Sequence, residues 1–285
     1  MTGPQNNDPP DLSQVTLCAI DTANTALAAR ALALCRRQCL FGDAVLIADQ
    51  PMDDTVRFER IAPLQTREQY SDFVLRHLHE QVSTPFVLLV QWDGYIIDSN
   101  QWSADFLDYD YIGAPWHWHR DAMTVGNGGF SLRSRRLLNL LATPGLPDPN
   151  GQPEDHYICR TLRPMLESRH NIRFAPPEIA ARFAYECSHP EAPSFGFHGL
   201  YNMWRHLEDA EVPELVERLA GYVVPSAEYA QILRMYFILR KFTPLFALYR
   251  RLRQTMTRIN AEQHLIREFG DAAAALSCVK LCERA

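Results

Sequence analysis

The stretch Val15–Asp49, "VTLCAIDTANTALAARALALCRRQCLFGDAVLIAD", contains the pattern that decides the fold. Its first six residues, Val15–Ile20, are an apolar run with β-branched side chains, which is typical of a buried strand. An Ala- and Leu-rich segment follows and predicts a helix, and Ala44–Asp49 is a second apolar run. A strand, a helix and a strand joined by short links predict a βαβ unit, and hence a parallel sheet with a right-handed crossover.

The alternation of helix and strand patterns continues along the chain. Arg67–Val82 has the spacing of an amphipathic helix, and Pro85–Asp93, "PFVLLVQWD", is the strongest strand signal in the sequence. Asp108–Trp116 is an extended stretch closed by Gly and Pro, and Gly128–Ser134 predicts a short strand before another helix. Glu154–Ser168 begins a helix with two acids in its first turn, where the helix dipole favours negative charge. We therefore expect one α/β domain.

Three regions differ in composition. Residues 1–14 are polar and Pro-rich, which predicts a disordered lead-in. Residues 15–204 form the expected α/β domain, and residues 205–285 contain little Gly and read as a C-terminal helical region. Within 231–260 there are seven Lys or Arg and no Asp or Glu. That stretch predicts either a basic surface for peripheral membrane contact or Arg stems that cover a helical packing surface.

Composition excludes several classes of protein. The net charge of −6 argues against a nucleic-acid binder. No apolar run has the length of a membrane span, and the N-terminus lacks the pattern of a signal peptide. Most of the seven cysteines lie in apolar patterns, which predicts reduced, packed thiols. We expect a cytoplasmic protein, with peripheral association at the inner membrane as a further hypothesis.

Carboxylates follow three of the predicted strands: Asp21, Asp49 and Asp93. Ligands of open α/β sheets bind outside the carboxyl ends of the strands, so these positions are candidate binding residues. Asp93 comes directly after the most apolar strand, where a carboxylate needs solvent, a cation or a helix terminus. The alternative for Asp93 is a strand-ending turn residue, because Gly94 follows it.

Other candidates lie outside the strand ends. Asp155 and Glu154 begin a helix, so each is either a general base or a helix cap. His198 lies in "FGFHG" and is either a ligand or a packed core residue. Trp116 and Trp118, in "WHWH", could form a platform for the apolar face of a sugar. A zinc site there would need two further ligands, and none has suitable spacing.

Two adjacent glycines, Gly128 and Gly129, precede a predicted strand in "VGNGGFSLRS". Glycine weakens a strand, so its use here points to a close approach of the backbone to a ligand. Asn127 could then offer its amide to sugar hydroxyls. The alternative is a glycine bulge that redirects the strand.

Five motifs together, "LLVQWDG", "DYDYIGAPW", "VGNGGFSLRS", "PEDHYICRTL" and "FGFHG", resemble in this order an uncharacterised bacterial and fungal family of GT-A, nucleotide-diphospho-sugar transferase type. The resemblance covers about Val15 to Tyr201. It implies a Rossmann-like mixed, mainly parallel sheet flanked by helices, to which the C-terminal helical appendage is added. It also implies transfer of a sugar from a nucleotide-diphosphate sugar to a glycan, lipid-linked or protein acceptor, as in cell-surface polysaccharide biosynthesis.

The resemblance assigns roles to particular residues. Asp93 matches the acid that binds a divalent metal, Mn²⁺ or Mg²⁺, and His198 matches a late histidine ligand. The usual motif has two acids, whereas this chain has Gln91, Trp92 and Asp93, all on the donor side. One carboxylate with phosphate oxygens and waters can still satisfy such an ion.

The remaining roles concern the acceptor and the nucleotide. Asp155 matches the acceptor-activating base, with Glu154 second, and a single base implies inversion. Asp21 and Thr22 at the first strand end, and Asp49 at the second, are expected on the nucleotide side.

Two other hypotheses remain. The first is a non-catalytic sugar-nucleotide or glycan-binding module with a partner-recruiting helical tail, which the missing first acid favours. The second is an α/β enzyme acting on another nucleotide, but neither GxxxxGK[ST] nor GxGxxG follows the first strand.

Overall fold

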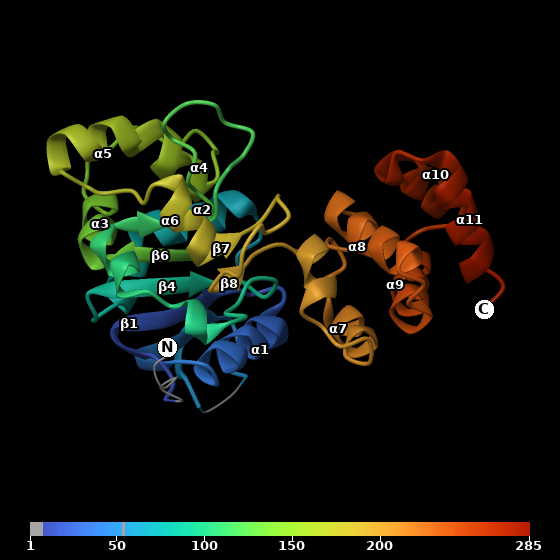
Figure 1. Cartoon of the computed structure of the whole chain (residues 1–285). Helices are drawn as coiled ribbons and strands as arrows, with labels where there is room; N and C mark the ends of the chain where they lie inside the picture. The colour runs from blue at the N-terminus through green and yellow to red at the C-terminus, as the bar shows by residue number, and fades with distance from the viewer. Residues whose placement is uncertain (1–7, 53–54) are drawn as a thin grey trace, which may run out of the picture. The chain divides into compact units, whose positions relative to one another are not determined.

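A computed structural model describes residues 8–52 and 55–285 of the chain. The chain divides into two compact units, Met1–His198 and Gly199–Ala285. The first unit contains the β-sheets and the second only helices (Figure 1). These compact units are defined by contacts within the structure and do not test the domain boundary that the sequence predicts after residue 204.

The central sheet of the first unit has six strands in the order β3-β2-β1-β4-β6-β5. Four of them run parallel: β3 (Arg57–Arg60), β2 (Leu40–Ala48), β1 (Asp11–Ile20) and β4 (Phe86–Val90). The apolar runs quoted above lie in the three strands β1, β2 and β4, and the second halves of these strands are buried on both faces, as is typical of parallel strands. The predicted βαβ unit is therefore present.

Strand β6 (Phe130–Ser134) runs against both of its neighbours, β4 and β5 (Tyr111–Ile112). Phe130 pairs with Val90, the last residue of β4. The start of β6 consequently lies at the same edge of the sheet as the ends of β1, β2 and β4. This mixed, mainly parallel sheet confirms the predicted fold class.

Helices cover both faces of the sheet. Helix α1 (Thr25–Arg36) packs against β1, β2 and β4. On the other face, apolar side chains of α2 (Arg67–Arg76) and α3 (Arg135–Leu141) join the β1, β2 and β4 side chains that point away from α1. The remaining elements of this unit are η1 (Leu78–Gln81), η2 (Ser99–Gln101), η3 (Ala104–Asp108), α4 (Glu154–His156), η4 (Tyr157–Leu162), α5 (Arg163–His170), α6 (Pro177–Phe183), β7 (Ala184–Tyr185) and β8 (Gly196–Phe197).

The structure differs from the sequence-based expectations at two strands. Strand β1 begins at Asp11, so the last part of the predicted lead-in belongs to the sheet, while residues 1–7 of that lead-in lie outside the described residues. The reason is that Asp11 and Leu12 pair with β2 across from Leu40 and Phe41. Strand β3 carries charged residues at an edge of the sheet and was not expected from its sequence.

The second unit is helical throughout, as predicted. Its buried side chains come from every helix, and Tyr229 on one helix donates a hydrogen bond of 2.8 Å to the Leu248 carbonyl on the next. None of the helices in the described part of the chain is long and apolar enough to cross a membrane. The elements are η5 (Leu200–Arg205), α7 (Val212–Arg218), α8 (Ala227–Ile238), α9 (Phe242–Thr255), α10 (Arg258–Phe269) and α11 (Ala272–Cys282).

Candidate functional site

Chemistry-bearing residues gather at the edge of the sheet where the parallel strands end. Gln91 follows β4 and donates its backbone N–H to the Gly129 carbonyl, 2.8 Å away at the start of β6. Burial raises the pKa of Asp21, hydrogen bonds from two backbone N–H groups oppose this, and the negative charges of Asp93 and Asp49 add to it. The three strand-end carboxylates are therefore electrostatic neighbours, as their positions in the sequence predicted.

Two of the three nucleotide-side candidates, Asp21 and Thr22, form hydrogen bonds that stabilise the local backbone. Asp21 Oδ1 accepts hydrogen bonds from the N–H groups of Ala23 (2.7 Å) and Asn24 (2.6 Å), which fixes the turn into α1. The Thr22 hydroxyl accepts one from the Leu64 N–H at 2.9 Å. Asp49 differs, because its Oδ1 is buried and has no hydrogen-bond partner among residues 8–52 and 55–285.

His198 is the centre of the first polar network. Its Nε2 lies 3.1 Å from Gln91 Oε1 and 3.5 Å from Asp93 Oδ1, and its Nδ1 lies 2.9 Å from Glu186 Oε1. Burial lowers the pKa of His198, but the Asp93 and Glu186 carboxylates outweigh burial and raise it well above the usual value. The structure thus brings together the two residues predicted to bind a metal.

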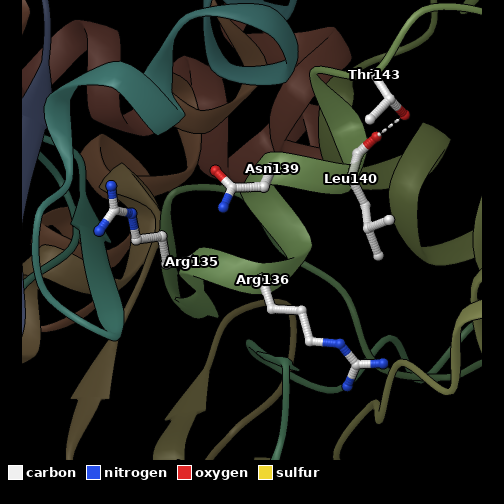
Figure 2. Close-up of a pocket in the computed structure, with 5 residues that line it drawn as sticks. All are labelled: Arg135, Arg136, Asn139, Leu140 and Thr143. Atoms are coloured by element: carbon white, nitrogen blue, oxygen red, sulfur yellow. Dashed lines mark hydrogen bonds between the residues drawn. The ribbon is translucent and has the colours of Figure 1, made fainter.

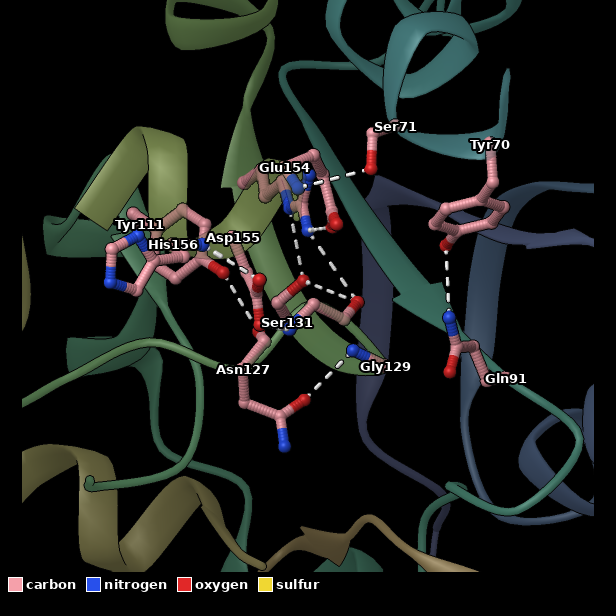
Figure 3. A network of polar contacts seen from close by, with 12 residues as sticks. Tyr70, Ser71, Gln91, Tyr111, Asn127, Gly129, Ser131, Glu154, Asp155 and His156 are labelled. Atoms are coloured by element: carbon pink, nitrogen blue, oxygen red, sulfur yellow. Dashed lines mark hydrogen bonds and ion pairs between the residues drawn. The ribbon is translucent and has the colours of Figure 1, made fainter. Parts of the chain in front are cut away.

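A hydrogen bond with Tyr70 fixes the orientation of the Gln91 side chain. Its Nε2 donates a hydrogen bond of 3.1 Å to the Tyr70 hydroxyl (Figure 3). The Gln91 Oε1 atom is thereby left to face His198. Trp92, the next residue, is half-buried in the turn. Tyr70 and Glu186 were missed in the sequence, and the only signal for Glu186 is that it follows a short apolar run.

The glycine pair separates this network from a second one. A Cβ on Gly129 would lie 2.0 Å from His198 Nε2, and a Cβ on Gly128 would lie 2.2 Å from Glu154 Oε1. Both glycines are needed because protein side chains pack against them. The sequence-based interpretation assigned this space to a donor sugar and is corrected on this point.

Asn127 also differs from the expectation. Its backbone has a φ of 70°, in the left-handed region, and its Oδ1 accepts hydrogen bonds from the N–H groups of Gly129 (2.8 Å) and Phe130 (3.1 Å). Its Nδ2 lies 3.2 Å from His198 Nδ1. The amide therefore holds the glycine turn and contacts the histidine, whereas hydrogen bonds to sugar hydroxyls were predicted.

The second network is a buried ion pair. Arg133 is completely buried, and its Nη2 donates a hydrogen bond of 2.8 Å to Glu154 Oε1. Its Nε donates to Ser131 Oγ at 3.0 Å, and its guanidinium lies 5.2 Å from the centre of the Tyr111 ring. Glu154, the second candidate for the base, is thus held in an ion pair inside the protein, which corrects that prediction.

Asp155 has a different environment from its neighbour. Its Oδ2 accepts a hydrogen bond from the Gly128 N–H at 3.1 Å, and its Oδ1 accepts one from the His156 N–H at 2.7 Å (Figure 3). Burial and the adjacent Glu154 charge raise the pKa of Asp155 to about 7. A carboxylate with such a pKa is suited to general-base catalysis near neutral pH.

Asp155 lies in the first turn of a continuous helical segment formed by α4, η4 and α5. The middle element, η4, is a π-helix, which is frequent at functional sites. Pro164 follows it and has no N–H to donate to the preceding turn, which gives a local reason for the wider winding.

The two tryptophans lie in a loop whose ends are joined by an antiparallel bridge between Pro115 and Val125. Trp116 is buried and packs on Gly126, where a Cβ would lie 2.2 Å from the indole, so it is a core residue and not the predicted platform. Trp118 is 54% exposed, with its ring 5.9 Å from that of Trp116.

A surface cavity of about 500 Å³ lies elsewhere, on α3 (Figure 2). Helix α3 follows the end of β6, which is at the opposite edge of the sheet from Gly129. The cavity therefore does not belong to the candidate site. Its lining residues are Arg135, Arg136, Asn139, Leu140 and Thr143.

The fold and these residues define an α/β protein with a polar site at the carboxyl edge of its sheet. Residues 54–198 match the family described as "Protein of unknown function (DUF5672)", and the chain belongs to this family. This match confirms the predicted resemblance to an uncharacterised family. No curated protein matches the sequence.

Solved structures similar to this chain include glycosyltransferases. One is a glycosyltransferase involved in the glycosylation of the major capsid of PBCV-1, with 14% identity over 65% of this chain and 91% of that chain, and a TM-score of 0.43. The galactosyltransferase LgtC, with donor and acceptor sugar analogs, has 13% identity over 66% and 86%, and a TM-score of 0.37. S. aureus TarS 1-349 has 11% identity over 95% and 91%, and a TM-score of 0.40. Because these likenesses are distant, the function proposed below rests on residues of this chain.

Proposed function

We propose that this protein is a glycosyltransferase that uses a nucleotide-diphosphate sugar as donor. One observation carries the proposal: the Asp93–His198 pair and the Asp155 carboxylate lie on the two sides of one glycine turn, at the carboxyl edge of a parallel sheet. Transfer to a hydroxyl needs both a group that stabilises the leaving diphosphate and a base for the acceptor.

Two distances on the donor side support the binding of a divalent cation. Two ligands bound at right angles to one Mg²⁺, each about 2.1 Å from the ion, lie about 3 Å apart. The distances from His198 Nε2 to Gln91 Oε1 and Asp93 Oδ1, 3.1 and 3.5 Å, are close to this spacing. No group of three or more His, Cys, Asp or Glu side chains suited to a metal occurs in the described part of the chain, so the amide oxygen of Gln91 would be the third ligand.

Each of these residues has a definable task. A bound Mn²⁺ or Mg²⁺ would neutralise charge on the departing diphosphate. His198 must be neutral at Nε2 to act as a ligand, so cation binding would release the proton that the carboxylates favour. Glu186 would then fix the tautomer and the ring orientation through Nδ1, as carboxylates beside metal-bound histidines do.

On the acceptor side, Asp155 removes the proton of the attacking hydroxyl. The two backbone N–H bonds to its oxygens hold the carboxylate in one orientation, and each oxygen keeps a lone pair for the acceptor. Attack at the anomeric carbon through an oxocarbenium-like transition state would invert the configuration. The exposed Trp118 ring would support a glycan, lipid-linked or protein-bound acceptor sugar.

The nucleotide would lie over the ends of β1 and β2. The Oδ1 atom of Asp49, which has no hydrogen-bond partner among the described residues, can accept a hydrogen bond from a ribose hydroxyl. Asp21 and Thr22 shape the turn beside it. We place the reaction in the cytoplasm, in the synthesis of a cell-surface glycan.

A binding module without catalysis is the second candidate, because Gln91 replaces an acid of the usual motif. A panel of UDP-, GDP- and dTDP-sugars separates the two functions. We expect one donor class to raise the melting temperature more strongly with Mn²⁺ than without it, and slow hydrolysis of that donor to follow. Donor binding without any hydrolysis or transfer would favour the binding module.

Single-residue variants test the roles proposed for Asp155 and Asp93. Asp155→Asn should bind the donor as the wild type does and lose transfer by about 10²–10⁴-fold. Asp93→Asn should lose the dependence of donor binding on Mn²⁺. Asp105→Asn, on the exposed surface, is the matched control and should behave as the wild type. Wild-type turnover by the Asp155 variant would remove the base from the proposal.

A further inference from the structure

The turn between α8 and α9 exposes a group of large apolar side chains. Ile238, Leu239 and Phe242 are 55%, 40% and 46% exposed, within five positions of the chain. The Phe242 ring stacks on Phe246, with the ring centres 5.9 Å apart. Scattered exposed apolar residues are common, but a contiguous group usually marks an interaction surface.

The turn residue itself is unusual. Arg240 has a φ of 55°, and the N–H of Lys241 donates to the Tyr236 carbonyl at 3.0 Å, which closes the end of α8. Glycine normally occupies such a left-handed position, because a Cβ there is unfavourable. The other non-glycine residues with positive φ in the described part of the chain are asparagines, which tolerate this conformation better: Asn127, Asn150 and Asn171.

Arg240 has no contact that accounts for its presence. Its side chain is exposed, and its guanidinium forms no hydrogen bond or ion pair with the described residues of the chain. The turn therefore retains a charged side chain where glycine would favour the fold. A binding partner outside the chain would provide a contact for the Arg240 guanidinium.

The charge around the turn is positive. Some basic residues of 231–260 are engaged within the unit: Lys241 pairs with Asp209 at 2.8 Å, and Arg253 with Glu283 at 3.0 Å. Arg250 is exposed, like Arg240, and follows Phe242 and Phe246 at intervals of four on α9, so the three share one helix face. Apolar residues flanked by exposed arginines, with no acid between residues 231 and 260, complement an apolar layer below negative charges.

We propose that the α8–α9 turn, Ile238–Phe242, docks on the surface of an anionic lipid membrane. The three apolar side chains enter the boundary between headgroups and acyl chains, and Arg240 and Arg250 contact lipid phosphates. Three apolar side chains and two charges give reversible binding. This inference is independent of the catalytic proposal, because it uses only residues of the second unit.

Sedimentation of the full chain with vesicles tests the proposal. We expect binding to phosphatidylcholine vesicles with 30% phosphatidylglycerol, weaker binding at high salt, and none to pure phosphatidylcholine. The double variant Leu239→Ser/Phe242→Ser should bind at least about tenfold more weakly. Arg240→Gly should bind about fivefold more weakly, yet melt at a higher temperature than the wild type because it relieves the left-handed strain.

Leu276→Ser is the matched control, since Leu276 is 45% exposed on α11 and is not part of the turn. It should bind vesicles as the wild type does. Absence of wild-type binding to anionic vesicles, or equal loss in the turn and control variants, would overturn the proposal. A wild-type dimer that Leu239→Ser/Phe242→Ser dissociates would assign the turn to a protein interface instead.

Discussion

Two polar networks lie on either side of the glycine pair, and they differ in how their charges are balanced. Beyond Gly128, the Arg133 cation and the Glu154 anion pair at 2.8 Å, both buried. Beyond Gly129, His198 is surrounded by oxygens of Asp93, Glu186 and Gln91. The first network pairs one buried cation with one buried anion, whereas the second places two carboxylates against one histidine, and it is there that we propose a cation binds.

Glu154 and Asp155 repeat this contrast at the scale of neighbouring residues. The Glu154 carboxylate has a buried cation as partner, and its place in the fold is structural. The Asp155 carboxylate accepts backbone hydrogen bonds, and burial raises its pKa to about 7. An acidic residue at a helix start is therefore a candidate base only where no cation neutralises it, which the sequence does not reveal.

The largest expected effect comes from breaking the buried ion pair between Arg133 and Glu154. Arg133→Met leaves the Glu154 carboxylate buried without its cation, which should lower the free energy of unfolding by about 3–5 kcal/mol. Urea denaturation measures this loss. The double variant Arg133→Met/Glu154→Met should recover most of the stability, because it removes both buried charges; a double variant as unstable as the single one would contradict the closed-pair interpretation.

The two glycines allow a matched comparison of the networks. Gly128→Ala forces a Cβ onto the Glu154 carboxylate and should cost about 1–3 kcal/mol of stability through the ion pair. Gly129→Ala forces one onto His198, so we expect weaker Mn²⁺-dependent donor binding from displacement of the ring relative to Asp93 and Gln91. Thermal denaturation with and without donor measures both effects. Loss of donor binding in the Gly128 variant alone would reverse the assignment of the two sides.

The smallest effect concerns pH. The folded-state pKa of Asp155, about 7, lies above its ordinary value of 3.8, so the folded chain keeps a proton that the unfolded chain releases between these values. The free energy of unfolding should fall as pH rises from about 4 to 7 and level off above 7, by about 1–2 kcal/mol because solvent screens a partly exposed group.

Asp155→Asn should flatten this part of the stability profile, as measured by melting temperatures from pH 4.5 to 7.5. Asp105→Asn should keep the wild-type slope. In the wild type, transfer activity should rise through pH 7 as the base ionises. An unchanged stability slope in the Asp155 variant would show that the carboxylate titrates at an ordinary pH.

Much of the fold follows from the sequence, because apolar runs that end in an acid identify buried parallel strands and place Asp21, Asp49 and Asp93 at one edge. The direction of β6 does not follow from its five residues. The family resemblance implied a mixed sheet without saying which strand is antiparallel. Ser131 and Arg133 of β6 look solvent-facing in an alternating strand, but both are buried because Glu154 and Tyr111 cover that face.

The site is predictable where a residue has a local signal and hidden where its role comes from a partner distant in sequence. Asp93, His198 and Asp155 each follow a strand, a glycine-flanked motif or a helix start. Tyr70 has no such signal, and Glu186 follows only the short strand β7. The contacts of these residues with Gln91 and His198 therefore cannot be predicted from the sequence.

The bridge between Pro115 and Val125 has a consequence for how this protein can diversify. It closes the Trp118 loop at its base, so residues 116–124 lie outside the ladder that pairs β6 with β4. Insertions or deletions between the buried Trp116 and the bridge should leave the sheet register and the positions of Asp93 and His198 unchanged. A library confined to residues 117–124 is therefore the natural place to search for new acceptor preferences of the proposed transferase.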